Sequence, residues 1–425
     1  MSYRSARATA TATVTATVTA KTLKTTSKST LRLMNGVFAV NKPSGRSSAN
    51  LISELQELFT KSEVFADDLK AMKDKMAYDL GQDKKWKNKW KKKVDAAKVK
   101  IGHGGTLDPL ASGVLVVGVG LGTKKLQYYL AECQKTYETK ALLGISTTTG
   151  DSEGEIITQN EIDFVTPEIV KLAAEKFVGD IKQTPPIFSA LKVNGKPLYE
   201  YARQGLPLPK EIKVRDVKVN SIEVIEKDLL TRDHEFKKLE SKLDENGVPL
   251  EHALKNNPTL NDSALYFSTQ YKENNKLDTD EHIKPRLLPD GEELPEKLPL
   301  IHFVSDVSSG TYIRSLISDI GRAMGSSAYM VELIRCKQSE WELGKNVFNM
   351  EDFEKSEKIW GPVLRKVLEN GGENIDIAKE MAQSEASHVE TADQKEAADK
   401  KETADQEEDS EQVSAKKRTI DEVEQ

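Results

Sequence analysis

The sequence predicts an α+β fold in which a central mixed or antiparallel sheet is flanked by helices. The first observation is that strand-like segments, in which apolar and polar residues alternate, are interleaved with segments of helical periodicity, as in residues 134–145 and 166–180. The second is that Gly- and Pro-containing turns typical of hairpins separate several of these segments. With 425 residues, of which 37% are hydrophobic, the chain can form one large or two ordinary domains with a packed core.

The first elements are expected at "GVFAVNKPSG" (36–45), a strand with a Pro-Gly turn, and "SSANLISELQELF" (47–59), a helix that Ser47 or Ser48 can cap. The apolar positions of this helix keep to one face, namely Leu51, Ile52, Leu55, Leu58 and Phe59.

Later elements show the same two patterns, the alternation of a strand and the 3.6-residue repeat of a helix. Residues 166–180 predict a helix with Ile169, Leu172 and Phe177 facing inward. Residues 299–325 predict a strand and then a helix with one apolar seam, formed by Ile313, Leu316, Ile317, Ile320 and Met324.

Other regions depart from this pattern. Residues 1–34 are basic, free of acids and rich in Thr, which predicts a disordered leader that is either a mitochondrial transit peptide or a plain tail. Residues 61–99 and about 230–298 are highly charged or polar and predict insertions, the second a long surface insertion. Residues 35–372 then form one domain, and residues 373–425 a disordered acidic tail.

Charge is unevenly distributed along the chain. The net charge is −6, and residues 373–425 hold 17 acidic and 7 basic residues, a balance of −10, which leaves +4 for the rest. A mildly basic folded part is compatible with a polyanionic partner. The tail also contains "AKKR" (415–418), which is either a weak nuclear address or a chance run of basic residues.

Several classes of protein are disfavoured. The two cysteines are far apart and the six histidines have no ligand spacing, so neither a structural disulfide nor a metal site is expected. No run of about 18 apolar residues predicts a membrane span. "GVGLG" (118–122) lacks the GxGxxG spacing of a nucleotide-binding loop.

A strongly basic stretch predicts contact with RNA. "KKWKNKWKKKVDAAKVK" (84–100) holds nine Lys, two Trp and one acid. Lysines neutralise phosphates and Trp rings stack on bases, so the candidate contacts are Lys84, Lys85, Trp86 and Trp90. The alternative is a solvated helix whose two Trp side chains pack on the core.

One carboxylate stands out in "KIGHGGTLDPLASGVLVVGVG" (100–120). Asp108 lies between a glycine turn and an apolar run, and Pro109 restrains its backbone. It either caps a turn or is held there for chemistry. Arg314, at the start of a predicted helix, is a candidate cation for an ion pair with it.

Five motifs occur in an order that resembles the TruB family of pseudouridine synthases: "GVFAVNKPSGRSS", "KIGHGGTLDPLASGVL", "KTYETKALLG", "TPPIFSALKVNGKPLYEYARQG" and "SSGTYIRSLISDIGRAMG". The resemblance covers about residues 36–226 and 298–345 and implies the pseudouridine synthase fold, in an isomerase that needs no cofactor. The two insertions, and the expected lack of the PUA domain usual in bacterial members, resemble a eukaryotic nuclear and mitochondrial type.

The resemblance also implies roles for individual residues. Asp108 matches the catalytic aspartate, Arg314 the arginine paired with it, and Tyr137 the tyrosine that stacks on the flipped base. Among substrate-binding residues, His103 matches a histidine that contacts the RNA and Leu333 an apolar residue beneath the base.

Lys42 and Pro43 match the KPxG motif, a structural support near the catalytic loop, and Lys42 is counted with the substrate-binding set.

One acid suits the implied reaction. Hydrolytic glycosidases generally need two carboxylates, but uracil leaves as a stabilised anion and no water takes part in the isomerisation. Asp108 then acts either as a nucleophile toward C1′ or as a base that forms a glycal, and both routes stay open.

The implied substrate is the T-loop uridine (position 55) of tRNA, with similar mRNA hairpins as further candidates, for a monomeric enzyme in the nucleus and mitochondrion. Two alternatives remain: a guide-RNA-dependent subunit of box H/ACA particles, and a non-catalytic tRNA folding chaperone.

Overall fold

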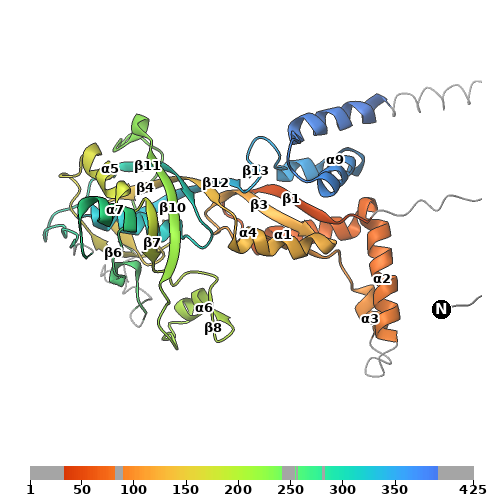
Figure 1. The fold of residues 1–425 in the computed structure, drawn as a ribbon, viewed down its shortest axis with the longest axis horizontal. Helices are drawn as coiled ribbons and strands as arrows, with labels where there is room; N and C mark the ends of the chain where they lie inside the picture. Colours follow the sequence, from red (N-terminus) through yellow and green to blue (C-terminus); the bar gives the residue numbers. More distant parts are fainter. Residues whose placement is uncertain (1–32, 82–89, 242–253, 255–256, 280–282, 391–425) are drawn as a thin grey trace, which may run out of the picture. The chain divides into compact units, whose positions relative to one another are not determined.

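A nine-stranded mixed sheet runs through the described part of the chain (Figure 1). The computed structural model describes residues 33–81, 90–241, 254, 257–279 and 283–390. Adjacent strands follow the order β1 (Gly36–Lys42), β3 (Ser112–Val119), β12 (Ala328–Gln338), β4 (Lys135–Leu143), β11 (Leu300–Val307), β10 (Arg215–Val224) and β7 (Gly179–Gln183). Two short strands complete it, β2 (Ile101–His103) beside β3 and β13 (Trp341–Glu342) beside β12.

Helices pack against both halves of this sheet, which confirms the α+β prediction. The pairing of β12 with β3 is parallel and the other pairings in the sheet are antiparallel. The helices are α1 (Ser48–Lys61), α2 (Ala66–Gly81), α3 (Trp90–Asp95), α4 (Leu126–Ala131), α5 (Pro167–Glu175), α6 (Leu198–Arg203), α7 (Thr269–Asn275), α8 (Ile313–Ala323) and α9 (Glu357–Asn370). Two separate hairpins lie outside the sheet, β5 (Ile145–Thr147) with β6 (Ile156–Gln159), and β8 (Lys192–Val193) with β9 (Lys196–Pro197).

The core consists of two large apolar clusters, one on each half of the sheet. The first includes side chains of β4, β11, α5 and α8, and the second includes side chains of β1, β3, α1 and α9. The predicted seam of α8 is buried along its whole length. In α1, Leu51, Leu55 and Phe59 are buried and Ser47 caps the first turn by accepting from Asn50 N. Both helices therefore form as their periodicity predicts.

The inward face predicted for α5 is wrong at one position. Leu172 is 57% exposed, whereas Val170, Ala173 and Ala174 are buried. The small side chains of Ala173 and Ala174 let α5 approach α8 and β10 closely. The buried face therefore contains these alanines, whereas the prediction places the larger Leu172 there.

The polar stretch around 230–298 is not entirely a surface insertion. Phe267, Leu294 and Leu298 are buried in the first apolar cluster, and α7 packs against β7. These apolar residues are too scattered to form a period of 2 or 3.6, which is why the sequence gives no sign of their burial.

The acidic tail begins later than residue 373. Residues 377–390 are helical, and Ile375, Ile377 and Met381 are buried in the second apolar cluster with α9. Three apolar residues on one side are enough to hold this segment, although its composition is that of a disordered chain. The rest of the tail and residues 1–32 of the leader lie outside the described residues.

Residues 61–99 contain two packed helices. α2 contacts α3 and has no buried residue. Phe65, just before α2, and Val99, shortly after α3, are buried in the second apolar cluster. Among the described residues, no helix has the length and apolar character required to cross a membrane.

Candidate active site

Asp108 lies in the loop between β2 and β3, and two glycines allow the shape of this loop. Gly105 has φ +138°, a conformation that disfavours other residues. A side chain at Gly104 would come within 2.6 Å of Tyr129 Cβ on α4. The glycine turn predicted from the sequence is therefore required both by backbone angle and by close packing.

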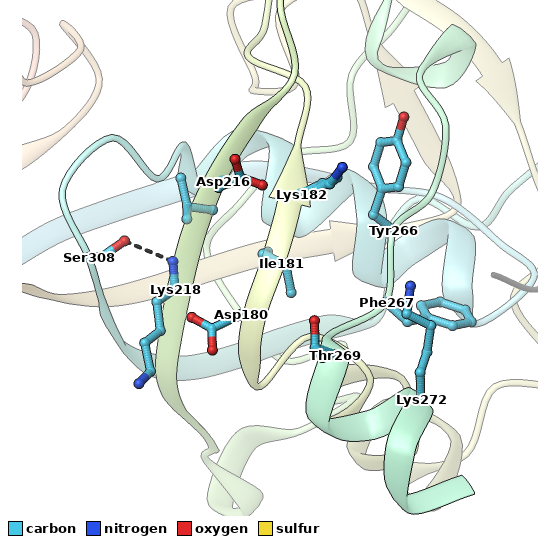
Figure 2. Close-up of a pocket in the computed structure, with 11 residues that line it drawn as sticks. Asp180, Ile181, Lys182, Asp216, Lys218, Tyr266, Phe267, Thr269, Lys272 and Ser308 are labelled. Atoms are coloured by element: carbon cyan, nitrogen blue, oxygen red, sulfur yellow. Dashed lines mark hydrogen bonds between the residues drawn. The ribbon is translucent and has the colours of Figure 1, made fainter. Parts of the chain in front are cut away.

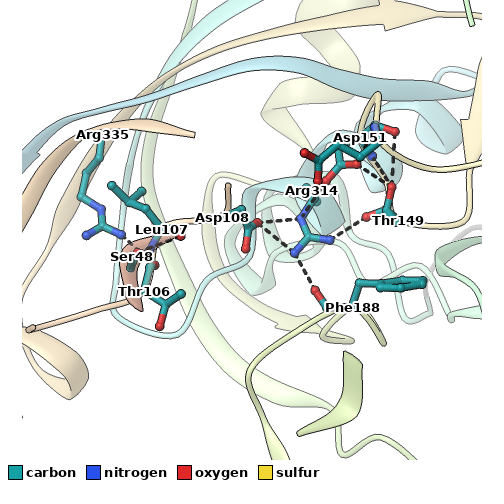
Figure 3. Close-up of polar contacts among 10 residues, drawn as sticks. Ser48, Thr106, Leu107, Asp108, Thr149, Asp151, Phe188, Arg314 and Arg335 are labelled. Carbon is teal, nitrogen blue, oxygen red and sulfur yellow. Dashed lines mark hydrogen bonds and ion pairs between the residues drawn. The ribbon is translucent and has the colours of Figure 1, made fainter. Parts of the chain in front are cut away.

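Asp108 and Arg314 form the ion pair that the sequence predicts (Figure 3). Nε of Arg314 donates to Oδ2 of Asp108 at 2.8 Å, and NH2 lies 2.8 Å from the same oxygen. The Arg314 side chain is only 4% exposed, whereas that of Asp108 is 35% exposed. The carboxylate is thus fixed from the buried side and open to a substrate on the other.

The remaining donors of Arg314 bind backbone carbonyls. NH1 donates to Thr149 O and NH2 to Phe188 O, both at 2.7 Å, and Asp151 Oδ2 lies 3.7 Å from Nε. Burial by itself would lower the pKa of the guanidinium, but the charges of Asp108 and Asp151 outweigh burial and raise this pKa. Asp151 is a buried second carboxylate that the sequence reasoning missed.

Arg335 was also missed, and it holds the loop that carries Asp108. This buried side chain of β12 donates through NH1 to Gly105 O at 3.3 Å and through NH2 to Thr106 O at 3.0 Å. It also donates to Gln338 Oε1 at 2.9 Å, and Gln338 Nε2 donates to Gly104 O at 2.7 Å. The available signal was a single Arg inside a strand that is otherwise mostly apolar.

Ser48 holds the residue before Asp108. Its Oγ donates to Leu107 O and accepts from Leu107 N, both at 2.9 Å. Because Ser47 caps α1, Ser48 is free for this role, which the sequence could not distinguish from capping.

Lys42 lies under the same loop and is fully buried. Its Nζ donates to Pro43 O at 2.8 Å, Arg46 O at 2.7 Å and Pro109 O at 3.2 Å. This arrangement is that of a structural support, as the KPxG resemblance implies, and a contact of Lys42 with substrate stays a prediction.

The buried ammonium of Lys42 gives a pH-dependent prediction. Burial lowers its pKa from 10.5 to about 8, although the charge of Asp108 raises it. Between these two values the unfolded chain retains a proton that the folded chain has lost, so the free energy of unfolding rises with pH over this range. We expect urea titrations to show wild type gaining on the order of 2 kcal/mol relative to Lys42→Met from pH 8 to 10.5. A constant difference would contradict a pKa near 8.

Tyr137 on β4 and Leu333 on β12 belong to the apolar cluster that Leu107 of the Asp108 loop also joins. Both are buried, and their strands are neighbours in the sheet. Nε of Arg335 donates to the Tyr137 hydroxyl at 3.2 Å. His103 ends β2 and is partly exposed, and burial lowers its pKa.

The predicted basic contacts are only partly described. Lys84, Lys85 and Trp86 lie outside the described residues. Trp90 is partly exposed on α3, which packs against α2, and Lys91 Nζ is 5.8 Å from the centre of its ring. The structure does not bring Trp90 into the Asp108 site.

A cavity of about 340 Å³ lies elsewhere, between β7, β10 and residues 266–272 (Figure 2). Acidic and basic side chains alternate along it, such as Asp180, Lys182, Asp216 and Lys218. None of the predicted site residues lines it, so the chemistry is assigned to the Asp108 site.

The arrangement suits reactions that need one oriented carboxylate. Asp108 is partly exposed beside a fixed positive charge, while Asp151 is buried behind Arg314. Among the residues that the structure describes, no cluster of His, Cys, Asp or Glu could hold a metal ion.

Comparison with known proteins agrees with these features. Residues 91–241 match the model of the TruB family pseudouridylate synthase, N terminal domain. The chain is 46% identical to tRNA pseudouridine synthase 4 of Saccharomyces cerevisiae over 83% of this chain and 89% of that protein. It is 36% identical to tRNA pseudouridine synthase 4 of Schizosaccharomyces pombe over 76% of this chain and 83% of that protein.

A solved structure of an H/ACA RNP bound to a substrate RNA containing 2'-deoxyuridine is 18% identical, with a TM-score of 0.38. The match covers 79% of this chain and 58% of that one. The extent and identity of the match to the two yeast proteins show that this chain belongs to the TruB family of pseudouridine synthases.

Proposed function

We propose that this chain is a stand-alone tRNA pseudouridine synthase that isomerises the T-loop uridine, with Asp108 as the reacting carboxylate. The observation that carries the proposal is the Asp108–Arg314 ion pair, which leaves one face of the carboxylate open. The names of the yeast relatives, which describe synthases acting on tRNA, support the choice of substrate.

The reaction moves one bond and needs no other reactant. The N1–C1′ bond breaks, the uracil turns, and a C5–C1′ bond forms; the proton on C5 is then lost and N1 gains one. Before this the uridine must leave its stack, at a cost of a few kcal/mol. The Asp108 carboxylate either attacks C1′ or removes a neighbouring sugar proton, and Arg314 keeps it aimed in both cases.

The test is to map pseudouridine in an unmodified tRNA transcript incubated with the purified protein alone. We expect one new site, in the T-loop, and none in a matched transcript whose T-loop uridine is replaced by cytidine. Activity that appears only with an added guide RNA would favour the H/ACA alternative. Binding and faster tRNA folding without any pseudouridine would favour a chaperone.

The basic helix α3 is proposed to contact the tRNA backbone. Lys91 and Lys92 are exposed there, and Lys98 follows shortly after. Each phosphate contact contributes about 0.7–0.9 to the slope of log affinity against log salt concentration. We expect replacing these three lysines with Gln to weaken tRNA binding and reduce that slope by about 2, with single-turnover rates at saturation unchanged.

A matched control replaces three exposed lysines on other elements, Lys345, Lys358 and Lys379, with Gln. This variant is expected to keep the wild-type slope. Equal slopes for all three proteins would exclude α3 as an RNA contact.

We further propose that the protein is located in the nucleus and in the mitochondrion. We also propose that it is a monomer and that it modifies similar hairpins in mRNA. The composition of residues 1–34 and "AKKR" (415–418) supports the two compartments. A fluorescent fusion lacking residues 1–34 should lose the mitochondrial signal, and one with Ala at 416–418 should lose nuclear accumulation. Light scattering tests the monomer, and pseudouridine mapping in mRNA from cells with and without the protein tests the hairpins.

A further inference from the structure

Residues 257–263, together with Leu254, connect three parts of the molecule that surround Arg314; they are called the bridging segment below. This segment lies inside the polar stretch that the sequence predicts to be a surface insertion, yet Leu254 and Leu260 are buried. We propose that the bridging segment positions the Arg314 guanidinium, and through it Asp108, for the reaction. The inference rests on the proposed function.

The first connection leads to a small module, residues 187–206, which contains the β8–β9 hairpin and α6. Leu254 packs in an apolar cluster with Ile187, Leu198 and Ala202. Nδ2 of Asn257 donates to Leu206 O at 3.1 Å, just after α6. The bridging segment therefore holds this module at two points.

The same module supplies one of the carbonyls that hold Arg314. Phe188 O, which accepts from Arg314 NH2, follows directly after Ile187. A displacement of the module would thus move an acceptor of the guanidinium.

The second connection leads to the loop 146–151. Nδ2 of Asn261 donates to Ser146 Oγ at 2.8 Å. Gly150 lies between the segment and Arg314, since a side chain there would come within 2.8 Å of Leu260 Cδ1 and 3.3 Å of Arg314 Cβ. This loop provides Thr149 O, the acceptor of Arg314 NH1, and the carboxylate of Asp151.

The third connection leads to α8, the helix that carries Arg314. NH1 of Arg322 donates to Ser263 O at 2.6 Å, and the short helix Leu260–Asp262 packs against α8. Thr259 and Asp262 close this short helix with reciprocal capping bonds, so the segment has a defined shape of its own.

One segment therefore fixes the module, the loop and the helix relative to each other. The two carbonyls and the backbone that orient Arg314 come from these three parts. Because misplacement of a catalytic group by about 1 Å can cost about 100-fold in rate, loosening the segment should slow the chemical step without removing any residue that touches uridine.

The test replaces Asn257 and Asn261 with Ala, which removes two side-chain hydrogen bonds. The control is Gln270→Ala in the same polar stretch. It also removes two hydrogen bonds, with Asp180 N and Asp180 Oδ2, and Asp180 provides no acceptor for Arg314. We expect the single-turnover rate on tRNA to fall by about 10- to 100-fold in the double variant, with tRNA affinity within a few-fold. The control should keep the wild-type rate.

A positioning role also predicts non-additivity. In an Arg314→Lys background the same double substitution should lower the rate by less than about 3-fold, because the group that it aligns is no longer a guanidinium. An equal fall in both backgrounds, or a wild-type rate in the double variant, would overturn the inference.

A second measurement does not depend on activity. Hydrogen exchange in residues 146–151 and 187–191 should be faster in the double variant than in wild type and in Gln270→Ala. Amide hydrogen exchange that is as slow in the double variant as in wild type, in both regions, would contradict the bridging role. A wild-type protein inactive on tRNA would instead count against the proposed function alone.

Discussion

Asp108→Asn is expected to abolish pseudouridine formation, with a fall of at least about 10⁴-fold in the single-turnover rate, or about 5.5 kcal/mol in the barrier. Asn has the same size as Asp, but its amide is neither a nucleophile toward C1′ nor a base. Because Asn keeps the size and polarity of Asp and only one side chain changes, the affinity for tRNA should change by no more than a few-fold. Rapid-quench assays with enzyme in excess, and filter binding of the same transcript, measure the two quantities.

The neighbouring carboxylate provides the matched control. Asp151→Asn makes the same chemical change behind Arg314, where the carboxylate is buried and 3.7 Å from Nε. Its loss of rate should be far smaller, because it can disturb the orientation of Arg314 and the hydrogen bonds that Asp151 accepts from Thr149 and Glu153, but removes no reacting group. Turnover by Asp108→Asn above about 1% of wild type would contradict the assignment of Asp108 as the reacting group.

Arg314→Gln has the second largest expected effect. The change leaves Asp108 and Asp151 without the cation that they share. Because the shorter Gln side chain cannot reach both carbonyls, at least one of Thr149 O and Phe188 O also loses its hydrogen-bond donor. Leaving a buried carboxylate, here that of Asp151, without its cation typically costs about 3–5 kcal/mol of stability. We expect that loss in urea unfolding, together with a fall of about 10²- to 10³-fold in single-turnover rate, or 3–4 kcal/mol in the barrier.

Arg314→Lys separates charge from geometry. It restores a positive charge but not the planar fork that reaches two carbonyls and a carboxylate at once. It should therefore recover part of the stability and less of the rate. A Gln variant that turns over tRNA at the wild-type rate would show that the ion pair has no part in catalysis.

Local periodicity was sufficient for elements with one large apolar face. The seam of α8 repeats at helical spacing from Ile313 to Met324, and its burial follows directly. In α5 the same reasoning failed at Leu172, because alanines occupy the close contact.

The site residues that lie in recognisable motifs could be predicted from the sequence, but those that contact the site from distant parts of the chain could not. Asp108 and Arg314 lie in recognisable motifs, and the structure brings them together. Ser48 and Arg335 act through backbone atoms of the loop, and such contacts leave no pattern in the loop's own side chains. The bridging segment likewise shows only scattered apolar residues in a polar background.

The clamp that Arg335 places on the loop has a consequence for biosynthesis. Arg335 and Thr106 are 229 positions apart in the chain, and the guanidinium binds the loop through carbonyl groups that are present from the moment the loop is made. Contacts between such distant residues form late in folding. A nascent chain that has not yet exposed β12 outside the ribosome has Asp108 and the contacts that Ser48 and Lys42 make with its loop, but it lacks the contacts from Arg335. The loop is therefore fully held only after β12 has left the ribosome, and chains that end before Arg335 should be unable to modify RNA.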